Sequence, residues 1–360
     1  MKKIALYLAG LMAMAPILCI LSSLQADACT SAIVSAKASR DGKPFIWKHR
    51  DTGTEHNFIE RVENPGHFTY IALFNGGDSL LRDAWMGMNE AGLMIMNTAS
   101  YNLAPDTAKL VDQEGAVMRR ALEICRTVDD FLNLLDTLPR PMGVQANFGI
   151  LDRNGEGGYV ETNDVGYTTF LMSDSVPYIV RTNFSFSGND TDGYGYIRYD
   201  NACQLLGTPP YSPEMLTEGL SRSFYNSLIG RDMSLPEEGR WVVDQDFIPR
   251  RSSSASIVMV NSLDDNEDVM YATLGYPPVG KLYRITVNKV PDDVRPILPG
   301  FKAPACTESI SRKRLAFPIE RGSGPHYIDM DYLRPVNEYF RFENLGVYGY
   351  KIDPILKVGE

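Results

Sequence analysis

Residues 26–35, ADACTSAIVS, join a long apolar N-terminal run to the first strand-like segment of the chain. Two lysines follow the initial methionine, as is typical of a secretory signal peptide, and Ala26-Asp27-Ala28 has the A-x-A form of a signal peptidase site. Cleavage after Ala28 would make Cys29 the first residue of the mature chain. A thiol and a free α-amine would then belong to one residue, and this pairing supplies a nucleophile together with its base.

Two other fates of this segment remain open. An uncleaved apolar run would anchor the protein in a membrane, and lipidation of Cys29 would make the protein a lipoprotein with a blocked amine. Residues 26–28 suit lipidation poorly, because a leucine-like residue is expected at the first place and an acidic middle residue is unusual. We therefore expect a signal peptide at 1–28 and a secreted or periplasmic protein with no membrane span after processing.

The composition narrows the class of protein. The 360 residues include 35 basic and 45 acidic side chains, and the net charge of −10 disfavours binding to nucleic acid or to an anionic membrane. Beyond the cleavage site lie Cys125, Cys203 and Cys306, whose spacing reveals no disulfide pairing. No cysteine or histidine has metal-ligand spacing, so we expect no metal site and no cofactor. A homo-oligomer stays open.

The first structural feature expected after the cleavage site is a β-hairpin. Residues 29–36 alternate small and β-branched side chains, residues 39–44 are typical of a turn, and residues 45–51 read as a second strand. Asp51 lies at the far end of this second strand. Because a hairpin returns its second strand alongside the first, Asp51 can lie near Cys29.

The rest of the chain predicts an α+β fold in which helices are segregated from strands. A Pro-rich change of composition near residue 291 marks a C-terminal extension, 291–360, which we expect to pack on the core. The strands are predicted at 68–74, on both sides of a tight turn within 85–97, at 146–151, 158–162, 178–183, 254–260, 269–273 and 281–287, and the helices at 113–125, 128–138, 196–206 and 210–228.

A thiolate that attacks an amide carbonyl needs partners. The α-amine can take the thiol proton, and a carboxylate such as Asp51 can orient the amine. The tetrahedral intermediate needs preorganised donors, for which neutral side-chain amides serve well. Asn97 and Asn183 each lie at the end of a predicted strand, although a turn or cap is the commoner role for an asparagine there.

Taken together, these stretches resemble the N-terminal nucleophile (Ntn) hydrolases of the choloylglycine hydrolase and penicillin acyltransferase group, which are linear amide C–N hydrolases and related to peptidase family C45. The resemblance rests on Cys29-Thr30 at a processed N-terminus, on Lys48-His49-Arg50-Asp51, and on GMNEAGL at 87–93 followed by Asn97. Arg181-Thr182-Asn183 adds weaker support. The similarity extends thinly over most of the mature chain.

The resemblance implies a four-layer αββα sandwich over residues 29–290. It also implies that Cys29 is the nucleophile, that its amine is the base and that Asp51 holds this amine. Asn97 and Asn183 would stabilise the oxyanion and position an N-acyl amide substrate. Within the same fold, acyl transfer to another amine is the nearest alternative to hydrolysis, and a non-catalytic or lipidated surface binding protein is the alternative of a different class.

Two positions differ from the family pattern. The arginine expected three residues before the aspartate is Lys48, which keeps the charge but loses the guanidinium fork. Arg50 shares a strand face with Lys48 and lies on the opposite face from Asp51. The family's late arginine aligns with Ala255, and Arg251 is the substitute that we expect to interact with substrate.

Overall fold

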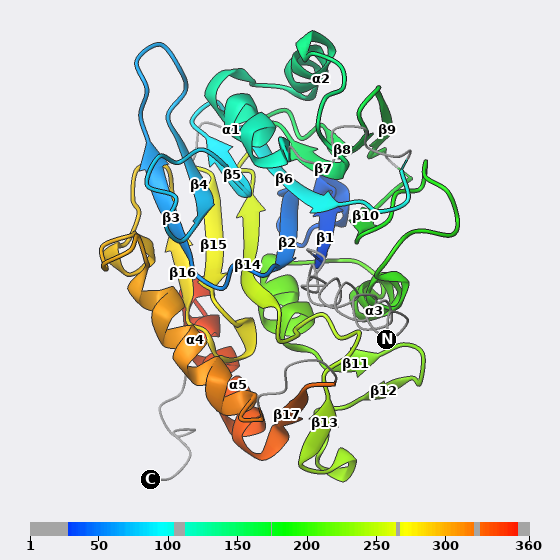
Figure 1. The fold of residues 1–360 in the computed structure, drawn as a ribbon, viewed down its shortest axis with the longest axis vertical. Coiled ribbons are helices and arrows are strands. Elements are labelled where there is room, and N and C mark those ends of the chain that lie inside the picture. Colours follow the sequence, from blue (N-terminus) through cyan, green and yellow to red (C-terminus); the bar gives the residue numbers. More distant parts are fainter. Residues whose placement is uncertain (1–27, 104–111, 174, 264–266, 320–324, 352–360) are drawn as a thin grey trace, which may run out of the picture.

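The computed structural model describes residues 28–103, 112–173, 175–263, 267–319 and 325–351, and it contains two large antiparallel sheets (Figure 1). The six-stranded sheet has the order β10 (Tyr178–Arg181), β1 (Ala28–Val34), β2 (Phe45–Asp51), β14 (Ser253–Val260), β15 (Val269–Leu274) and β16 (Leu282–Ile285). The seven-stranded sheet has the order β3 (Asn57–Val62), β4 (Tyr70–Asn75), β5 (Met86–Asn89), β6 (Met94–Ala99), β7 (Ala146–Leu151), β8 (Gly157–Thr162) and β9 (Tyr167–Leu171).

Helices cover the outer faces of the two sheets (Figure 1). α1 (Glu114–Ile124) packs against β5 and β6, and α2 (Val128–Thr137) places Phe131 edge-on against Phe148 of β7. On the other side of the sandwich, α3 (Tyr196–Leu206) packs against β1 and β10. The layers therefore run helix, sheet, sheet, helix, which confirms the predicted α+β sandwich.

Successive side chains of β1 point in opposite directions, so this one strand contacts two layers of the fold. Ile33 points into the core cluster between the sheets, where it joins Met86 and Met96 of the seven-stranded sheet. Ala32 and Val34 point the other way and join a separate cluster with residues of α3. Because successive side chains of a strand face opposite sides, a strand buried on both faces needs apolar or paired residues at every position.

The predicted N-terminal hairpin is confirmed. β1 and β2 pair antiparallel, with Ala28 opposite Asp51 and Cys29 opposite Arg50. The predicted helices near 113–125, 128–138 and 196–206 are also present, and the side chain of Thr127 caps α2 in a capping box with Asp130. The register of the hairpin brings Asp51 to the end of the sheet at which Cys29 lies.

The predicted helix over residues 210–228 is wrong. That segment forms a π-helical turn at Met215–Gly219, a 3-10 turn at Leu220–Arg222 and the start of a small sheet of β11 (Tyr225–Asn226) and β12 (Arg231–Asp232). The Ser221 hydroxyl donates to the Leu216 carbonyl at 2.8 Å, and such side-chain bonds to the main chain compete with the regular helical pattern.

Two strands of the seven-stranded sheet were not predicted, and both are its edge strands. Only the first half of β3 is fully buried, and none of the residues of β9 is. Edge strands with partly exposed polar residues lack a clear apolar alternation, which is the signal that sequence reasoning uses.

The C-terminal segment contributes α4 (Pro304–Ala316) and α5 (Met330–Leu345), and β17 (Tyr327–Asp329) pairs with β13 (Trp241–Val243). α4 packs against β15 (Figure 1), and Cys306 and Ile310 belong to the core cluster of the sandwich. No helix among the described residues is both long and apolar enough to cross a membrane. The predicted signal peptide falls, apart from Ala28, outside the described residues.

Candidate active site

Cys29 is the second residue of β1 and is buried. Its main-chain nitrogen donates to Oδ1 of Asn183 at 2.9 Å, and the Asn183 side-chain amide donates in turn to the Ala99 carbonyl at 2.8 Å. Burial raises the pKa of the Cys29 thiol, whereas the charge of Lys48 and a hydrogen bond from the Asp51 backbone act against this rise. The structure thus joins Cys29, Asp51 and Asn183 at one end of the six-stranded sheet.

Arg198 of α3 is a residue of this site that the sequence reasoning missed. Its guanidinium donates to the Cys29 carbonyl at 2.5 Å, to the Thr30 hydroxyl at 3.1 Å and to Oδ1 of Asn183 at 2.8 Å. Burial lowers the pKa of Arg198 to about 10, so the side chain stays charged at neutral pH. One cation therefore fixes both the carbonyl of Cys29 and the amide that accepts from its nitrogen.

Asp51 is fully buried, and two residues hold its carboxylate, one just before β14 and one at the start of this strand. Oδ2 accepts from Arg250 at 2.5 Å, and Oδ1 accepts from the Ser253 hydroxyl at 2.6 Å. Nε2 of His49 lies 2.8 Å from the same hydroxyl, and burial lowers the pKa of His49 to about 4, so this imidazole is neutral near pH 7. The nitrogen of Cys29 is bonded to Asn183, whereas we expected Asp51 to hold it.

Asn97 belongs to a chain of polar contacts between the sheets. Nζ of Lys48 donates to Oδ1 of Asn97 at 2.6 Å and to the Trp85 carbonyl at 3.0 Å. The Asn97 amide donates to the carboxyl of Glu114, whose pKa burial and the nearby Asp112 raise to about 8. One N–H of Asn97 is thereby engaged, so only its second N–H can serve an oxyanion.

Arg50 turns away from Asp51, as strand alternation predicts. Its guanidinium donates to Asn57 at 2.6 Å and to Asn75 at 3.0 Å, and it stacks on Trp85 with 5.0 Å to the ring centre. Nζ of Lys48 donates to the main-chain carbonyl of the same tryptophan, so Lys48 and Arg50 lie on the same face of β2, between the sheets.

The structure places Arg250, and not Arg251, against the Asp51 carboxylate. The main-chain nitrogen of Arg251 donates to Asp244 at 3.2 Å, and its side chain lines a cavity beyond the end of β2. The sequence signal for Arg250 was present, since the two arginines are adjacent, but the pattern could not tell which of them faces Asp51.

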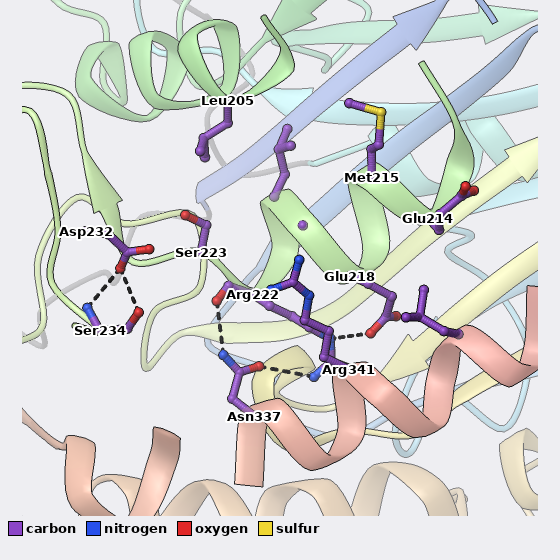
Figure 2. A pocket seen from close by; sticks show the side chains of 13 residues that line it. Leu205, Glu214, Met215, Glu218, Arg222, Ser223, Asp232, Ser234, Asn337 and Arg341 are labelled. Carbon is purple, nitrogen blue, oxygen red and sulfur yellow. Dashed lines mark hydrogen bonds and ion pairs between the residues drawn. The ribbon is translucent and has the colours of Figure 1, made fainter. Parts of the chain in front are cut away.

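A separate cavity of about 460 Å³ lies between residues 214–223 and α5. Polar side chains line part of it (Figure 2). Nε of Arg222 lies 2.7 Å from Glu218, and Asn337 of α5 donates to the Arg222 carbonyl. None of its lining residues is a candidate catalytic residue. Among the described residues, no group of three His, Cys, Asp or Glu side chains could hold a metal ion.

Comparison with known proteins adds a family match. The family model described as acyl-coenzyme A:6-aminopenicillanic acid acyl-transferase matches residues 39–198. This segment includes Asp51, Asn97, Asn183 and Arg198, but neither Cys29 nor Arg250. No curated protein matches the chain.

Several solved structures are similar in fold. A Caenorhabditis elegans ortholog of N-acylethanolamine-hydrolyzing acid amidase is 16% identical, covers 66% of this chain and 94% of its own, and has a TM-score of 0.46. A variant of conjugated bile acid hydrolase from Clostridium perfringens is 11% identical, with 73% and 94% covered and a TM-score of 0.43. Penicillin V acylase from Agrobacterium tumefaciens is 11% identical, with 73% and 87% covered and a TM-score of 0.42.

At such identities and TM-scores these likenesses say nothing about substrate or residue roles. The family match stands apart from them, because it is a match of sequence and covers the segment from the turn after β1 to the start of α3. The match covers less than half of the chain, and it shows that residues 39–198 are similar in sequence to the acyl-coenzyme A:6-aminopenicillanic acid acyl-transferase family.

Proposed function

We propose that this protein is a secreted amidase that cleaves the linear C–N bond of N-acyl amides with Cys29 as an N-terminal nucleophile. The observation that supports this proposal best is the fixation of the Cys29 main chain on both sides. Asn183 accepts from its nitrogen, and Arg198 donates to its carbonyl. A nucleophile at the start of a strand needs such fixation, because a misplacement of about 1 Å can cost on the order of a hundredfold in rate.

In the proposed reaction, removal of residues 1–28 frees the α-amine of Cys29. The amine takes the thiol proton, and the sulfur attacks the amide carbonyl carbon to form a C–S bond. The C–N bond then breaks, and the leaving amine receives the proton from the α-amine. Water next attacks the thioester and the C–S bond breaks, which releases a carboxylic acid and returns a proton to the Cys29 sulfur. One amide and one water thus give one acid and one amine.

The surrounding charges fit this sequence of steps. Burial and the negative charge of Asp51 raise the pKa of the Cys29 thiol, and the charge of Lys48 counteracts part of this rise. The second N–H of Asn97 is the amide donor that we assign to the oxyanion, and Asn183 positions the Cys29 nitrogen. Asp51, held by Arg250 and Ser253, presents a fixed negative charge beside the strand end at which the amine is formed.

Acyl transfer is the second candidate, and the matched family model, which describes an acyl-transferase, favours it. The first half of the reaction is the same, and an amine instead of water attacks the thioester. The ratio of transferred to hydrolysed product, measured with increasing concentrations of an added amine, separates the two activities.

The decisive experiment measures the mass of the exported protein and the amide hydrolysis of two variants. We expect the mature chain to begin at Cys29 and Cys29→Ser to lose activity towards chromogenic N-acyl amides. Cys203→Ser is the control, because Cys203 is also a free cysteine and is more exposed than Cys29, and this variant should keep activity. A mature chain that begins elsewhere, or a diacylglycerol mass on Cys29, contradicts the proposal.

A further inference from the structure

Glu114, the first residue of α1, carries a buried carboxyl that contacts the candidate oxyanion donor. Its Oε2 accepts an N–H from the Asn97 amide of β6. Within the described ranges of the chain, no lysine, arginine or histidine forms an ion pair with this carboxyl. The helix dipole favours an acid in the first turn of a helix, but that effect requires neither burial nor a contact with a strand.

The contact between Glu114 and Asn97 lies on the side of the six-stranded sheet that carries the Cys29 side chain. In the register of β1 and β2, Cys29 lies opposite Arg50 and Ser31 lies opposite Lys48. Opposite residues of an antiparallel pair share a face of the sheet, and so do residues two apart on one strand. Cys29 and Lys48 therefore both face the space between the sheets, where Lys48 meets Asn97.

Two partners determine which way the Asn97 amide points. The Lys48 ammonium group has only N–H donors, so at 2.6 Å it meets the amide oxygen. Nδ2, on the other side of the amide, then donates one N–H to Glu114. In a flipped amide, Nδ2 would face the ammonium group and two donors would oppose each other. Among the described residues, the second N–H of Asn97 meets no acceptor, and the two contacts set its direction.

Stability alone does not account for a glutamate at this position. A buried polar group costs free energy even when it is bonded, and an apolar side chain of similar size in its place is often nearly neutral. Burial and the nearby Asp112 raise the pKa of Glu114 to about 8, which shows that its environment disfavours the charged form. A buried acid that no cation within the described ranges pairs with is therefore better explained by what it does to Asn97.

We propose that Glu114 is a positioning residue, which accepts one N–H of Asn97 and thereby directs the second N–H at the oxyanion of the tetrahedral intermediate. This inference rests on the proposed function, because the oxyanion forms only when the Cys29 sulfur attacks an acyl carbon. Glu114 acts through Asn97 and not on the substrate. Its effect extends to both halves of the reaction, since amide cleavage and thioester hydrolysis each pass through an oxyanion.

The first test removes the acceptor and keeps a buried side chain of similar size. The substrates are the p-nitroanilides of acetic, decanoic and phenylacetic acid, and absorbance measures the released p-nitroaniline. We expect Glu114→Leu to lower kcat about 10- to 100-fold and to change KM less than about threefold, because a displaced donor weakens binding of the transition state and not of the substrate. Glu114→Gln keeps an acceptor oxygen and should restore most of kcat.

A double-mutant cycle tests whether the effect passes through Asn97. Asn97→Ala removes the donor itself and should lower kcat at least as much as Glu114→Leu. When Asn97 is already alanine, Glu114→Leu should lower kcat by less than about a further twofold, because no amide remains to be positioned. General damage to the fold would instead multiply with the loss that Asn97→Ala causes.

Glu123→Leu is the matched control. Glu123 is a second buried acid of α1, but it lies near the end of the helix and pairs with Arg119 and Arg120. This variant should keep kcat within about twofold of the wild type, and thermal unfolding compares the stability of all variants. A loss of kcat as large as that of Glu114→Leu would show that disturbance of α1 is the cause, and would overturn the positioning role.

The remaining outcomes separate this inference from the proposed function. If the wild type cleaves a p-nitroanilide and Cys29→Ser does not, but Glu114→Leu keeps its kcat, the positioning role is overturned and the amidase is not. The role is also overturned if the losses multiply in the double variant, or if Glu114→Gln restores nothing. If the wild type cleaves none of the three p-nitroanilides, the proposed function fails and the positioning role fails with it.

Discussion

At Glu114 a buried carboxyl shares a polar network with Lys48, the lysine whose charge acts on the nucleophile. Burial and Asp112 raise the pKa of Glu114 to about 8, so its carboxyl is mostly protonated at neutral pH. Lys48, which reaches the same network through Asn97, then keeps a positive charge that Glu114 does not neutralise. That charge is the largest influence that lowers the pKa of the Cys29 thiol, so a neutral Glu114 favours the thiolate.

The raised pKa of Glu114 makes a prediction about stability. The folded state holds this proton up to about pH 8, whereas the unfolded state loses it near 4.5. The contribution of Glu114 to the free energy of unfolding is therefore complete below pH 4.5 and is lost as the pH rises towards 8, with a limiting slope of about 1.4 kcal/mol per pH unit. We expect Glu114→Gln to remove this part of the pH dependence.

Urea unfolding of the wild type and Glu114→Gln at several values between pH 5 and 8 measures the difference. The exposed Glu156→Gln is the control and should leave the slope unchanged. Curves for wild type and Glu114→Gln that stay parallel over this range would show that Glu114 is ionised in the folded protein.

Among the secondary-structure elements, the contact between α3 and β1 controls the geometry of the nucleophile. Arg198 is almost fully buried, and it bonds the Cys29 carbonyl and Asn183 from outside the six-stranded sheet. We regard it as a positioning residue, since its contacts are to the main chain of Cys29 and to a second side chain. Its pKa of about 10 means that its charge does not change in the range of normal assays.

We expect Arg198→Met to lower kcat by about 10- to 100-fold and to change KM little. The reason is that the thiol loses its orientation, whereas Arg198 itself makes no contact that we assign to substrate. Arg198→Lys keeps the charge but not the fork, so it should restore part of kcat. Steady-state kinetics on the processed enzyme, with thermal unfolding as the check on the fold, provides the measurement. An equal loss of stability and kcat in both variants would instead indicate a purely structural role.

The same elements show why some of the site could be predicted and some could not. The position of Asp51 followed from a hairpin, in which antiparallel pairing returns β2 alongside β1. Arg250 and Arg251, in contrast, lie in the turn before β14, and only Arg250 contacts the Asp51 carboxylate. The conformation of a turn decides which of two adjacent side chains faces a partner, and no alternation in the sequence reveals it.

Arg198 was beyond prediction for another reason. The helix that carries it was predicted with the observed bounds, but helical periodicity says only which residues share a face. Its partner Cys29 is 169 residues away in the sequence, and the contact exists only because α3 lies on the outer face of β1. Local patterns of residues therefore located the elements, whereas the packing of the layers decided which polar side chains meet.

For the molecule as a whole, the C-terminal segment packs on the sandwich. Val294, Ala303 and Ile310 are buried in the core cluster that fills the space between the sheets and beside β15. Lys313 and Arg314 in the last turn of α4 also line a cavity just beyond the end of β2, so α4 contacts both the core and the turn that follows Asp51.

The proposed activation also concerns the whole chain, because it depends on where the mature protein begins. In the full-length chain the nitrogen of Cys29 is part of a peptide bond and cannot accept a proton. We expect a chain of residues 29–360 preceded only by an initiator methionine, which aminopeptidase removes in the host, to be active without export. The same chain with two glycines before Cys29 should fold equally well and have less than about one hundredth of the activity.

Mass spectrometry establishes the N-terminus of each product, and thermal unfolding establishes that both are folded. Reaction of the thiol with iodoacetamide adds a readout that does not depend on substrate. The alkylation rate should fall as the pH is lowered through the titration of the α-amine, and only in the chain that begins at Cys29. Equal activity of the two chains would mean that the α-amine is not the base. The proton acceptor would then have to be sought among the side chains around Cys29, where His49 is neutral, buried and bonded to Ser253.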